Sequence, residues 1–342
     1  ELGIEHERPH QADSDALVTA QLLLKCLKQL NDLPLLTLQR IEQQLQQGNA
    51  AVADLAWLIA EVRGKKELTP NQAEDALNYY RHFALKNGEW SSDEEQVAEF
   101  TNEAWEDFSE FLQELKQNLA AEFANYEARP AQEEMMNHVY EALSDKKHLM
   151  IEAGTGTGKS LGYLIPALYH SLVHDETVVV STHTINLQEQ LLKRDIPLLQ
   201  QVFPAPFKAA FLKGRSHYLC LRKFEQRVNR VDPGQSKEEV LTIAQMLNWI
   251  GQTEHGDDEE LHFNPKGREI WDEVASDTDS CLNRACPWFH RCYYHRAKHK
   301  ANQANVVITN HSMLFTDQIA EHRLLPAYQK LIVDEAHHFE EV

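Results

Sequence analysis

A glycine-rich stretch in the middle of the chain, AGTGTGKS at residues 153–160, constrains the fold more than any other feature. The run before it, residues 148–153, is short and largely apolar, and the run after it has helical periodicity. Glycine permits backbone conformations in which successive N–H groups point at a phosphate, and a helix that begins there adds the positive end of its dipole. The sequence therefore predicts a strand, a phosphate-binding loop and a helix within an α/β domain.

The side chains of this loop suit a nucleoside triphosphate and Mg²⁺. Lys159 is predicted to reach the β- and γ-phosphates, and the Ser160 hydroxyl is predicted to ligate Mg²⁺. The strict pattern has glycine where Ala153 stands, but alanine is small and lies outside the phosphate curl. The residues predicted to contact the nucleotide here are Ala153, Gly154, Thr155, Gly156, Thr157, Gly158, Lys159 and Ser160.

A pair of carboxylates near the end of the chain fits the same chemistry. The apolar run at residues 331–333 leads to Asp334 and Glu335. At the end of a central strand, Asp334 would help to hold Mg²⁺, and Glu335 would orient and deprotonate the attacking water. Alone, this motif is equally an ordinary strand end. Together with the phosphate loop it predicts nucleoside triphosphate hydrolysis.

The pattern of predicted secondary structure changes at about residue 125. Beyond it, short β-rich runs alternate with helical ones, which predicts a parallel sheet covered on both faces. The segment from about residue 214 to 296 interrupts this alternation and holds four cysteines, so we expect an inserted domain there. Upstream, residues 26–125 predict a mostly helical region that includes an acidic amphipathic helix.

Composition bounds the class of protein. The chain has 342 residues, of which 42% are hydrophobic and 25% charged, as in a soluble globular protein. No apolar run approaches the roughly 20 residues of a membrane helix, and the first residues are too polar for a signal peptide. We therefore expect no membrane span and a cytoplasmic location. The chain begins without methionine and stops after a predicted strand and turn, so we also expect a fragment of a longer protein.

Charge is unevenly distributed along the chain. The net charge of −20 argues against nucleic-acid binding by the whole surface, but residues 281–300 contain five Lys or Arg, three His and no acid. In this basic island, Trp288 is a candidate to stack on single-stranded bases, and Arg291 is a candidate to hold a phosphate. The alternative is a small core wrapped around a metal, with solvated basic flanks.

The same island holds three of the five cysteines. Cys281, Cys286 and Cys292 are separated by four and five residues, and Cys220 lies upstream. Three close ligands and a remote one are typical of iron–sulfur sites, whereas zinc sites more often use two close pairs. The spacing leaves an iron–sulfur cluster, zinc and unligated thiols open. Cys26, in a helical stretch, is interpreted as a small buried residue.

Six features follow one another in this order: YEARPAQEEM at residues 126–135, EAGTGTGKS, STHTINLQEQLL, the four cysteines, VVITNHSMLF and VDEAHH. Their order resembles that of the DinG branch of the XPD-like superfamily 2 DNA helicases, over residues 126–342. The resemblance implies a first RecA-like motor domain, incomplete here, that carries an inserted [4Fe–4S] domain. It also implies ATP-driven 5′→3′ translocation on single-stranded DNA and unwinding of forked DNA, in repair or replication.

The resemblance also implies roles for individual residues. Gln132 would contact adenine, and His337 would couple the nucleotide to DNA. The segment that contacts DNA in such motors contains Thr182, Thr184 and Gln188. The cluster would be ligated by Cys220, Cys281, Cys286 and Cys292. Such motors bind ATP between two RecA-like domains, and the second domain is not in these residues.

The N-terminal stretch HQADSDALVTAQLL resembles the last motif of DnaQ-like 3′→5′ exonucleases, in which a His and an Asp five residues later serve a metal site. These residues are His10 and Asp15 here, and residues 1–25 would be the C-terminal edge of such a domain. The preceding acidic motifs of that family are absent. The alternative is a helix N-terminus with acidic caps.

Three functions compete on this sequence. The first is an ATP-dependent helicase with an iron–sulfur domain. The second is an ATP-gated 3′→5′ exonuclease whose helicase-like domain does not unwind DNA. The third is a redox-responsive DNA-binding module without ATP turnover, which has no need of the phosphate loop or of the carboxylate pair.

Overall fold

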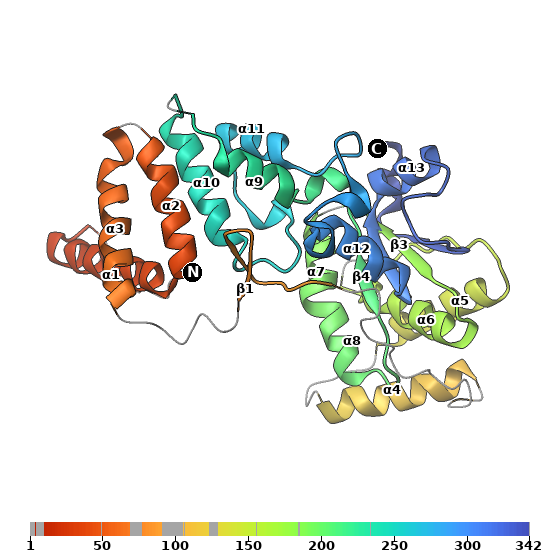
Figure 1. Ribbon diagram of the computed structural model, residues 1–342. Helices are drawn as coiled ribbons and strands as arrows, with labels where there is room; N and C mark the ends of the chain where they lie inside the picture. Colours follow the sequence, from red (N-terminus) through yellow and green to blue (C-terminus); the bar gives the residue numbers. More distant parts are fainter. Residues whose placement is uncertain are drawn as a thin grey trace. The chain divides into compact units, whose positions relative to one another are not determined.

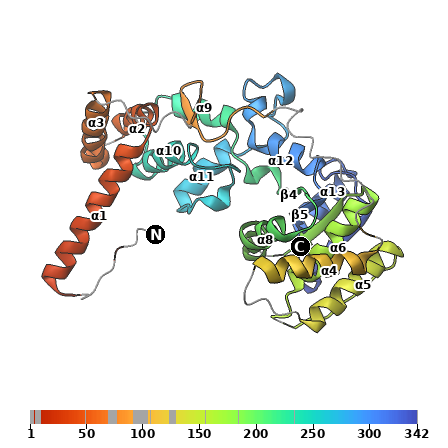
Figure 2. The same ribbon diagram turned by 90° about the horizontal axis from the view of Figure 1, so that it is seen from below.

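The computed structural model describes residues 4, 10–48, 50–68, 77–90, 105, 107–122, 129–154, 156–183, 185–232 and 234–341. The chain divides into two compact units, which Figures 1 and 2 show from two sides. The nucleotide unit comprises residues 91–214 and 294–342, and the cysteine unit comprises residues 1–90 and 215–293. Residues 215–293 are thus an insertion in the nucleotide unit, and they fold with the N-terminal part of the chain.

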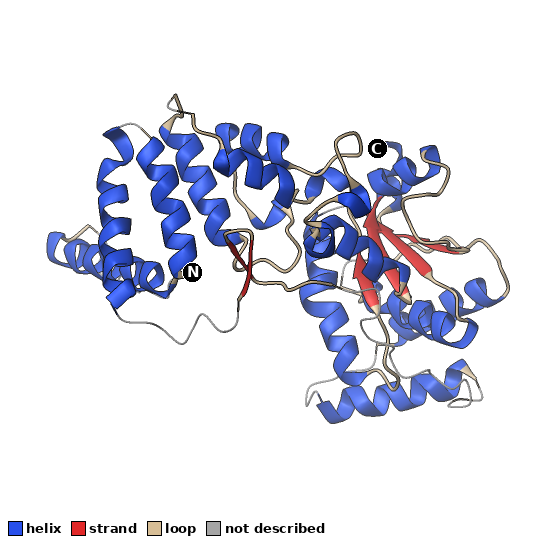
Figure 3. Cartoon of the chain, viewed as in Figure 1, coloured by secondary structure: helices blue, strands red, loops and turns tan. Residues whose placement is uncertain are grey.

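A four-stranded parallel sheet forms the centre of the nucleotide unit (Figure 3). The strand order is β4 (Ala209–Phe211), β5 (Val306–Asn310), β3 (Val178–Thr182) and β6 (Lys330–Val333). The central strands β3 and β5 are almost wholly buried. Their continuous valine and isoleucine runs suit strands that are covered on both faces, because β-branched side chains pack well there. The predicted parallel sheet is confirmed.

Helices cover both faces of this sheet. Leu164 and Leu199 share one core cluster with Val180, while Met313 shares another with Val179, because neighbouring residues of a strand point to opposite faces. The helices of the unit are α4 (Phe108–Glu122), α5 (Pro130–Ser144), α6 (Lys159–His174), α7 (Ile185–Gln190), the π turn η3 (Leu191–Asp195), α8 (Ile196–Val202), α12 (Tyr293–Asn302), α13 (His311–Ile319) and the 3₁₀ segment η8 (Ala336–Glu341). The predicted acidic helix corresponds to α4.

The phosphate loop is not preceded by a strand. Residues 147–154 have no regular secondary structure, and the Met150 side chain is 97% exposed. A strand needs a neighbour that pairs with its N–H and C=O groups. Among the described residues, the edge strand β6 pairs with β3 alone, and no strand pairs with residues 148–153. The prediction of a strand at residues 148–153 was therefore wrong.

The cysteine unit is mostly helical, and α2 packs against both α3 and α10 (Figure 1). The stripe that α2 buries is Leu38, Ile41 and Leu45, at steps of three and four. The helices of the unit are α1 (Ala12–Asp32), α2 (Leu35–Gln47), η1 (Ala50–Val52), α3 (Ala53–Leu68), η4 (Arg215–His217), α9 (Leu221–Asn229), α10 (Lys237–Trp249), η5 (Asp258–Glu260), α11 (Pro265–Val274), η6 (Asn283–Ala285) and η7 (Phe289–Arg291).

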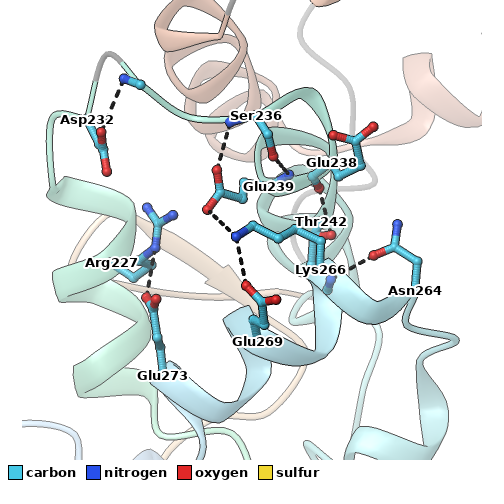
Figure 4. Close-up of polar contacts among 12 residues, drawn as sticks. Arg227, Asp232, Ser236, Glu238, Glu239, Thr242, Asn264, Lys266, Glu269 and Glu273 are labelled. Carbon is cyan, nitrogen blue, oxygen red and sulfur yellow. Dashed lines mark hydrogen bonds and ion pairs between the residues drawn. The ribbon is translucent and has the colours of Figure 1, made fainter.

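Side-chain caps determine where α10 and α11 begin (Figure 4). Ser236 and Glu239 form a capping box in which each side chain accepts a hydrogen bond from the other residue's backbone N–H. Asn264 accepts a backbone hydrogen bond from the first turn of α11. Lys266 then joins the two helices through an ion pair with Glu239, at 3.5 Å.

A β-hairpin that the sequence pattern did not predict follows α3. Strand β1 (Asn78–Tyr80) pairs antiparallel with β2 (Phe83–Leu85). The two residues between them, Arg81 and His82, have φ values of 46° and 67°, as a type I′ turn requires. All three residues of β2 are buried. The predicted helical region therefore contains a hairpin that belongs to the cysteine unit.

Helix α1 has no buried residue, and Figure 2 shows it extending away from α2. Leu17 and Leu24 are among its exposed leucines. Cys26 is exposed as well, which corrects its interpretation as a buried residue, since no described element covers that face of the helix. Neither α1 nor any other helix in the described part of the chain is long and apolar enough to cross a membrane.

Candidate nucleotide site and four-cysteine site

The phosphate loop contains two glycines in left-handed conformations, Gly156 and Gly158, with φ values of 83° and 80°. A Cβ atom on Gly158 would lie 2.0 Å from Nε2 of Gln132, so a side chain there would displace this contact. Gln132 donates a hydrogen bond to the Gly158 carbonyl at 2.8 Å, and Arg129 donates one to the Gly156 carbonyl at 2.6 Å. The start of α5 therefore holds the loop. Thr155 lies outside the described residues.

Helix α6 begins directly after this loop, with Gly158 as its N-cap and Lys159 as its first residue. The free N–H groups and the positive end of the helix dipole therefore lie at the loop. The first turn of α6 carries no acidic residue that would repel a phosphate. Within the loop, the Thr157 hydroxyl donates to the Gly154 carbonyl at 2.9 Å. Ala153, at the start of the loop, is partly buried.

The phosphate loop and the carboxylate pair meet at Tyr163, one turn into α6. The buried Tyr163 hydroxyl donates a hydrogen bond to Asp334 Oδ2 at 3.0 Å. Burial raises the pKa of Tyr163 well above its ordinary value, the Asp334 charge adds to this rise, and a hydrogen bond with Ser160 opposes it. The tyrosine therefore stays a neutral donor. Ser160 and Asp334, the two predicted magnesium ligands, thus contact the same side chain.

Asp334 and Glu335 have different surroundings. The Asp334 N–H donates to the Ser181 carbonyl at 2.9 Å, which continues the pairing of β6 with β3 beyond the end of β6. Glu335 has a left-handed backbone, with φ of 55°, and its N–H donates to Asp334 Oδ1 at 2.9 Å. Glu335 Oε2 is buried and has no hydrogen-bond partner. Both carboxylates therefore keep acceptor capacity at this end of the sheet.

The segment predicted to contact DNA is less accessible than expected. Thr182 is fully buried at the end of the central strand β3, and Gln188 in α7 is 5% exposed. Neither side chain is available to a DNA strand in this structure, which corrects the prediction for these two residues. Thr184 lies outside the described residues. His337 is exposed, with its ring 4.1 Å from the His338 ring.

Two of the predicted cysteine ligands act on the charge of a third, Cys286. Burial raises the pKa of the Cys286 thiol, and Cys220 and Cys281 raise it further. The backbone makes two successive 3₁₀ turns, η6 and η7, which end at Cys286 and Cys292. None of the four cysteines forms a disulfide bond, and each is partly exposed. The structure therefore gathers Cys220, Cys281 and Cys286, and a tight turn leads from them to Cys292.

Trp288, predicted to stack on DNA bases, is instead part of the core of the cysteine unit. Its side chain is 1% exposed. The Tyr80 and Phe83 rings contact it edge-on, with ring centroids at 4.9 Å and 5.7 Å. Its Nε1–H donates to Glu225 Oε2 at 2.8 Å. In this structure Trp288 is therefore a core residue, as in the alternative of a small core around the cysteines. The prediction that it stacks on DNA bases is corrected.

Arg291, predicted to hold a DNA phosphate, is also engaged internally. Its Nη1 donates to Glu89 at 2.6 Å, and its guanidinium lies 3.9 Å from the centre of the Tyr80 ring. Nearby, the Trp90 N–H and Nε1–H donate to the carbonyls of His290 and Phe289. Sequence reasoning missed residues 77–90 as partners of the cysteine segment, because no local pattern signals contacts across roughly 200 residues.

One other group of metal-type donors lies close together in the described chain: His217, Asp257 and Asp258, within 4.8 Å of one another. Asp258 already pairs with His217 at 2.8 Å and with Arg268 at 2.6 Å. The hydrogen bond to Asp258 raises the pKa of His217. Burial works against the ionised form of Asp258, but these two partners outweigh it and lower the pKa of this carboxyl. The group is a compensated ion-pair network.

His10 and Asp15 lie close together at the start of α1. The His10 N–H donates to Asp15 Oδ1 at 3.2 Å, and His10 has a left-handed φ of 67°. Asp15 and Asp13 both lie in the first turn of the helix. This is the geometry of acidic residues at a helix N-terminus, and it also leaves the His10 ring exposed beside a carboxylate.

A protein-family model described as "Type III restriction enzyme, res subunit" matches residues 125–341. The chain is also 38% identical over 346 residues to "3'-5' exonuclease DinG" of Bacillus subtilis, which covers 99% of this chain and 35% of that protein. It is 39% identical over 226 residues to "ATP-dependent helicase DinG" of Mycobacterium tuberculosis, covering 61% of this chain and 34% of the relative.

"ATP-dependent DNA helicase YoaA" of Escherichia coli is 33% identical over 229 residues, which covers 66% of this chain and 35% of that protein. The chain therefore spans about a third of the length of these curated relatives. The match to the first of them extends upstream of the nucleotide unit, through the helices and the hairpin of the cysteine unit.

Proposed function

The chain belongs to the DinG-type superfamily 2 helicases, and from this membership and the geometry of the site we propose that it is the first motor segment of an ATP-dependent DNA helicase. One observation carries the proposal: the hydroxyl of Tyr163, one turn into the helix that follows the phosphate loop, donates a hydrogen bond to the strand-end carboxylate of Asp334. This hydrogen bond connects the two predicted halves of a nucleotide–Mg²⁺ site.

The donors present fit Mg²⁺ bound with ATP. Ser160 and Asp334 supply oxygen ligands, and Glu335 Oε2 is a buried acceptor without a partner. Mg²⁺, when bound, neutralises charge on the phosphate oxygens. Lys159, at the start of α6, would hold the β- and γ-phosphates, and Glu335 would orient the attacking water.

The hydrogen bond that Gln132 makes with the phosphate loop is compatible with its proposed contact with adenine. Its Nε2 is engaged by the Gly158 carbonyl, so its Oε1 remains to accept a hydrogen bond. The exocyclic amine of adenine is a donor, which matches that acceptor. Gln132 would therefore connect recognition of the base with the shape of the phosphate loop.

The four cysteines support a [4Fe–4S] cluster as the group that this site would hold. Their pattern of three close ligands and one remote one is more typical of an iron–sulfur site than of a zinc site. Cys220, Cys281, Cys286 and Cys292 would hold the cluster, and Cys→Ser variants of the full-length protein would lose iron and sulfide together.

Translocation in the 5′→3′ direction on single-stranded DNA, unwinding of forked DNA and a role in repair or replication complete the proposal. These activities belong to whole proteins, and this chain spans about a third of the length of its relatives. We therefore propose them from family membership. ATP in such motors lies between two RecA-like domains, so we expect the 342-residue chain alone to hydrolyse ATP poorly. Robust DNA-stimulated ATPase activity from this chain alone would contradict that expectation.

The test uses the full-length protein with an end-labelled forked DNA. Lys159→Ala is expected to reduce ATP turnover and unwinding together, by at least about a hundredfold, because the phosphates lose their main cation. The control is Lys147→Ala, which removes an exposed lysine whose ion pair joins it to Asp145, away from the phosphate loop. Unwinding that survives loss of ATP turnover would overturn the proposal.

The second candidate is an ATP-gated 3′→5′ exonuclease whose helicase-like part does not unwind DNA. The observation that favours it is α1, in which Leu17, Leu22, Leu23 and Leu24 are exposed and whose start brings His10 beside Asp15. One relative is itself named an exonuclease. The same forked DNA separates the two candidates: a helicase releases a full-length strand, whereas an exonuclease shortens the labelled strand from its 3′ end.

A further inference from the structure

Four histidines lie at the edge of the sheet where the predicted catalytic carboxylates lie. His183 follows β3, His311 begins α13 after β5, and His337 and His338 follow β6 in η8. Parallel strands bring their C-terminal ends to one edge, which explains why residues so far apart in sequence meet. The His183 ring stacks on His338 at 4.1 Å and lies 5.9 Å from His311.

His311 differs from the other three because it is buried, with an exposed fraction of 1%. Its Nδ1 lies 2.6 Å from the Ser181 hydroxyl in β3, and this contact is buried as well. The Phe339 ring packs edge-on against it at 4.9 Å. His311, from the start of α13, therefore joins β3 to the segment that follows β6.

Ser181 contacts both His311 and Asp334. Its side chain contacts His311, while its backbone carbonyl accepts the N–H of Asp334 at 2.9 Å. Any movement of Asp334 that changes this backbone contact therefore acts on a residue whose side chain is held by His311. Ser181 immediately precedes Thr182 and His183, which lead to α7.

The other ring nitrogen of His311, Nε2, is buried without a hydrogen-bond partner. Leaving a buried polar atom unpaired is costly, so such an atom marks a place where a second arrangement gains a hydrogen bond. Glu335 Oε2 is a second unpaired buried atom at the same edge. Both atoms lie at the edge of the sheet that holds the proposed catalytic carboxylates, where a bound nucleotide would change their surroundings.

We propose that His311 is a positioning residue that couples the nucleotide-dependent state of Asp334 and Glu335 to the segment that follows β3. This inference rests on the proposed function, because it assigns a role within the same motor. Within the nucleotide unit, the described contacts of His311 do not include the phosphate loop, so its effect is expected on communication rather than on nucleotide binding. Loss of the His311 contact to Ser181 should separate ATP hydrolysis from its response to DNA.

The experiment measures kcat and KM for ATP in the full-length protein, with and without single-stranded DNA. In His311→Ala we expect the DNA-stimulated to basal kcat ratio to fall by about five- to 150-fold, the range of typical coupling between sites. Basal kcat and KM should stay within about twofold, because the phosphate contacts are unchanged. His311→Asn, whose amide is able to reach Ser181, should restore most of the ratio.

Two further variants keep the test independent of folding. Ser181→Ala removes the same hydrogen bond from β3, so its effect and that of His311→Ala should be non-additive in the double variant. His170→Ala is the matched control, because His170 is also a buried histidine of the nucleotide unit but pairs with Glu176 instead. It should lower stability and leave the ratio intact.

The outcomes separate this inference from the proposed function. If the wild-type protein shows no DNA-stimulated ATP hydrolysis, the proposed function fails. If the wild-type protein is stimulated and both His311→Ala and Ser181→Ala retain the ratio, the inference alone is overturned. An equal fall of the ratio in His170→Ala would also overturn it, since a general loss of stability would then explain the effect.

Discussion

The burial of Trp288 leads to a prediction that separates a core residue from a DNA-stacking residue. Two substitutions distinguish these roles. Trp288→Ala removes the whole ring from between Tyr80 and Phe83, whereas Trp288→Phe keeps an aromatic ring but removes the donor to Glu225. A core role makes both variants less stable, whereas a stacking role makes only the alanine variant bind DNA more weakly.

The contacts set the magnitude of each effect. Truncation of a fully buried aromatic residue to alanine costs about 3–5 kcal/mol. Loss of the hydrogen bond to the Glu225 carboxylate costs about 1.5–3 kcal/mol. We expect the lower end for Trp288→Phe, because Glu225 keeps its ion pair with Arg81 at 3.3 Å. The alanine variant should therefore be the less stable of the two by about 2 kcal/mol.

Hydrogen exchange, measured by mass spectrometry on the full-length protein, reports the loss of stability in the segment around Trp288. Amides in η6 and η7 should exchange at least about a hundredfold faster in Trp288→Ala and about tenfold faster in Trp288→Phe, up to the limit of global unfolding. Trp57→Ala serves as the control, because Trp57 is 66% exposed and belongs to the same unit. It should leave exchange in this segment unchanged.

DNA binding supplies the result that would refute this reasoning. Stacking of one base on an aromatic ring is worth about 1–3 kcal/mol, so a stacking Trp288 would weaken single-stranded DNA binding by about five- to 150-fold in the alanine variant. Trp288→Phe would then bind nearly as well as the wild type. That pattern, with unchanged hydrogen exchange in η6 and η7, would show that the ring faces DNA in solution.

Three further predictions follow from single contacts. Tyr163→Phe removes the donor to Asp334, and steady-state kinetics on the full-length protein should show kcat for ATP lower by about tenfold or more, since bonds to charged acceptors are worth about 1.5–3 kcal/mol; an unchanged kcat would separate the tyrosine from catalysis. The pKa of His217 is raised by Asp258, so its stabilising contribution is complete below the ordinary value of 6.5 and is lost as pH rises through the folded-state pKa. Urea unfolding from pH 6 to 9 should therefore show stability declining more in the wild type than in His217→Gln, and parallel curves would contradict this. Asp317 is fully buried, and its Oδ1 accepts two backbone N–H groups of the loop after α13. Asp317→Ala leaves both donors unpaired and should lower the free energy of unfolding by about 2–5 kcal/mol, whereas a change below about 0.5 kcal/mol would show that water replaces the carboxylate.

The parts of the nucleotide unit that the sequence predicts well depend on local pattern. The strands β3 and β5 stand out as runs rich in β-branched residues, because both are buried on both faces of the sheet, whereas the edge strand β6 is only partly buried. The run at residues 148–153 is also short and largely apolar, yet it forms no strand here. Composition supplies the side chains of a strand, but hydrogen bonding requires a neighbour, and the pattern of one segment does not contain that information.

The site shows the same division between local and distant information. The phosphate loop and the Asp-Glu pair are motifs of fixed spacing, so their chemistry is evident before their geometry. Tyr163 was missed although a signal exists: it lies three residues after Ser160, and residues at that spacing share a helix face. Its contact with Asp334 spans 171 positions, which no helical period predicts.

The basic island illustrates why charge in a sequence does not equal charge available to a partner. Its residues are divided between the two units, since the boundary falls between Tyr293 and Tyr294. In the cysteine unit the island contributes two arginines, and Arg291 is held by Glu89 and by the Tyr80 ring. Arg284, in the turn between Cys281 and Cys286, is exposed.

A phosphate bound near the four thiols would therefore contact Arg284. Trp288 and Arg291 stabilise the turn that carries Arg284. Two acids of this neighbourhood, Glu89 and Glu225, are engaged with Arg291 and Trp288, whereas the exposed Asp279 lies two residues before Cys281. The aromatic residues next to the cysteines therefore act in packing, and we expect any contact of this unit with a phosphate at exposed residues such as Arg284.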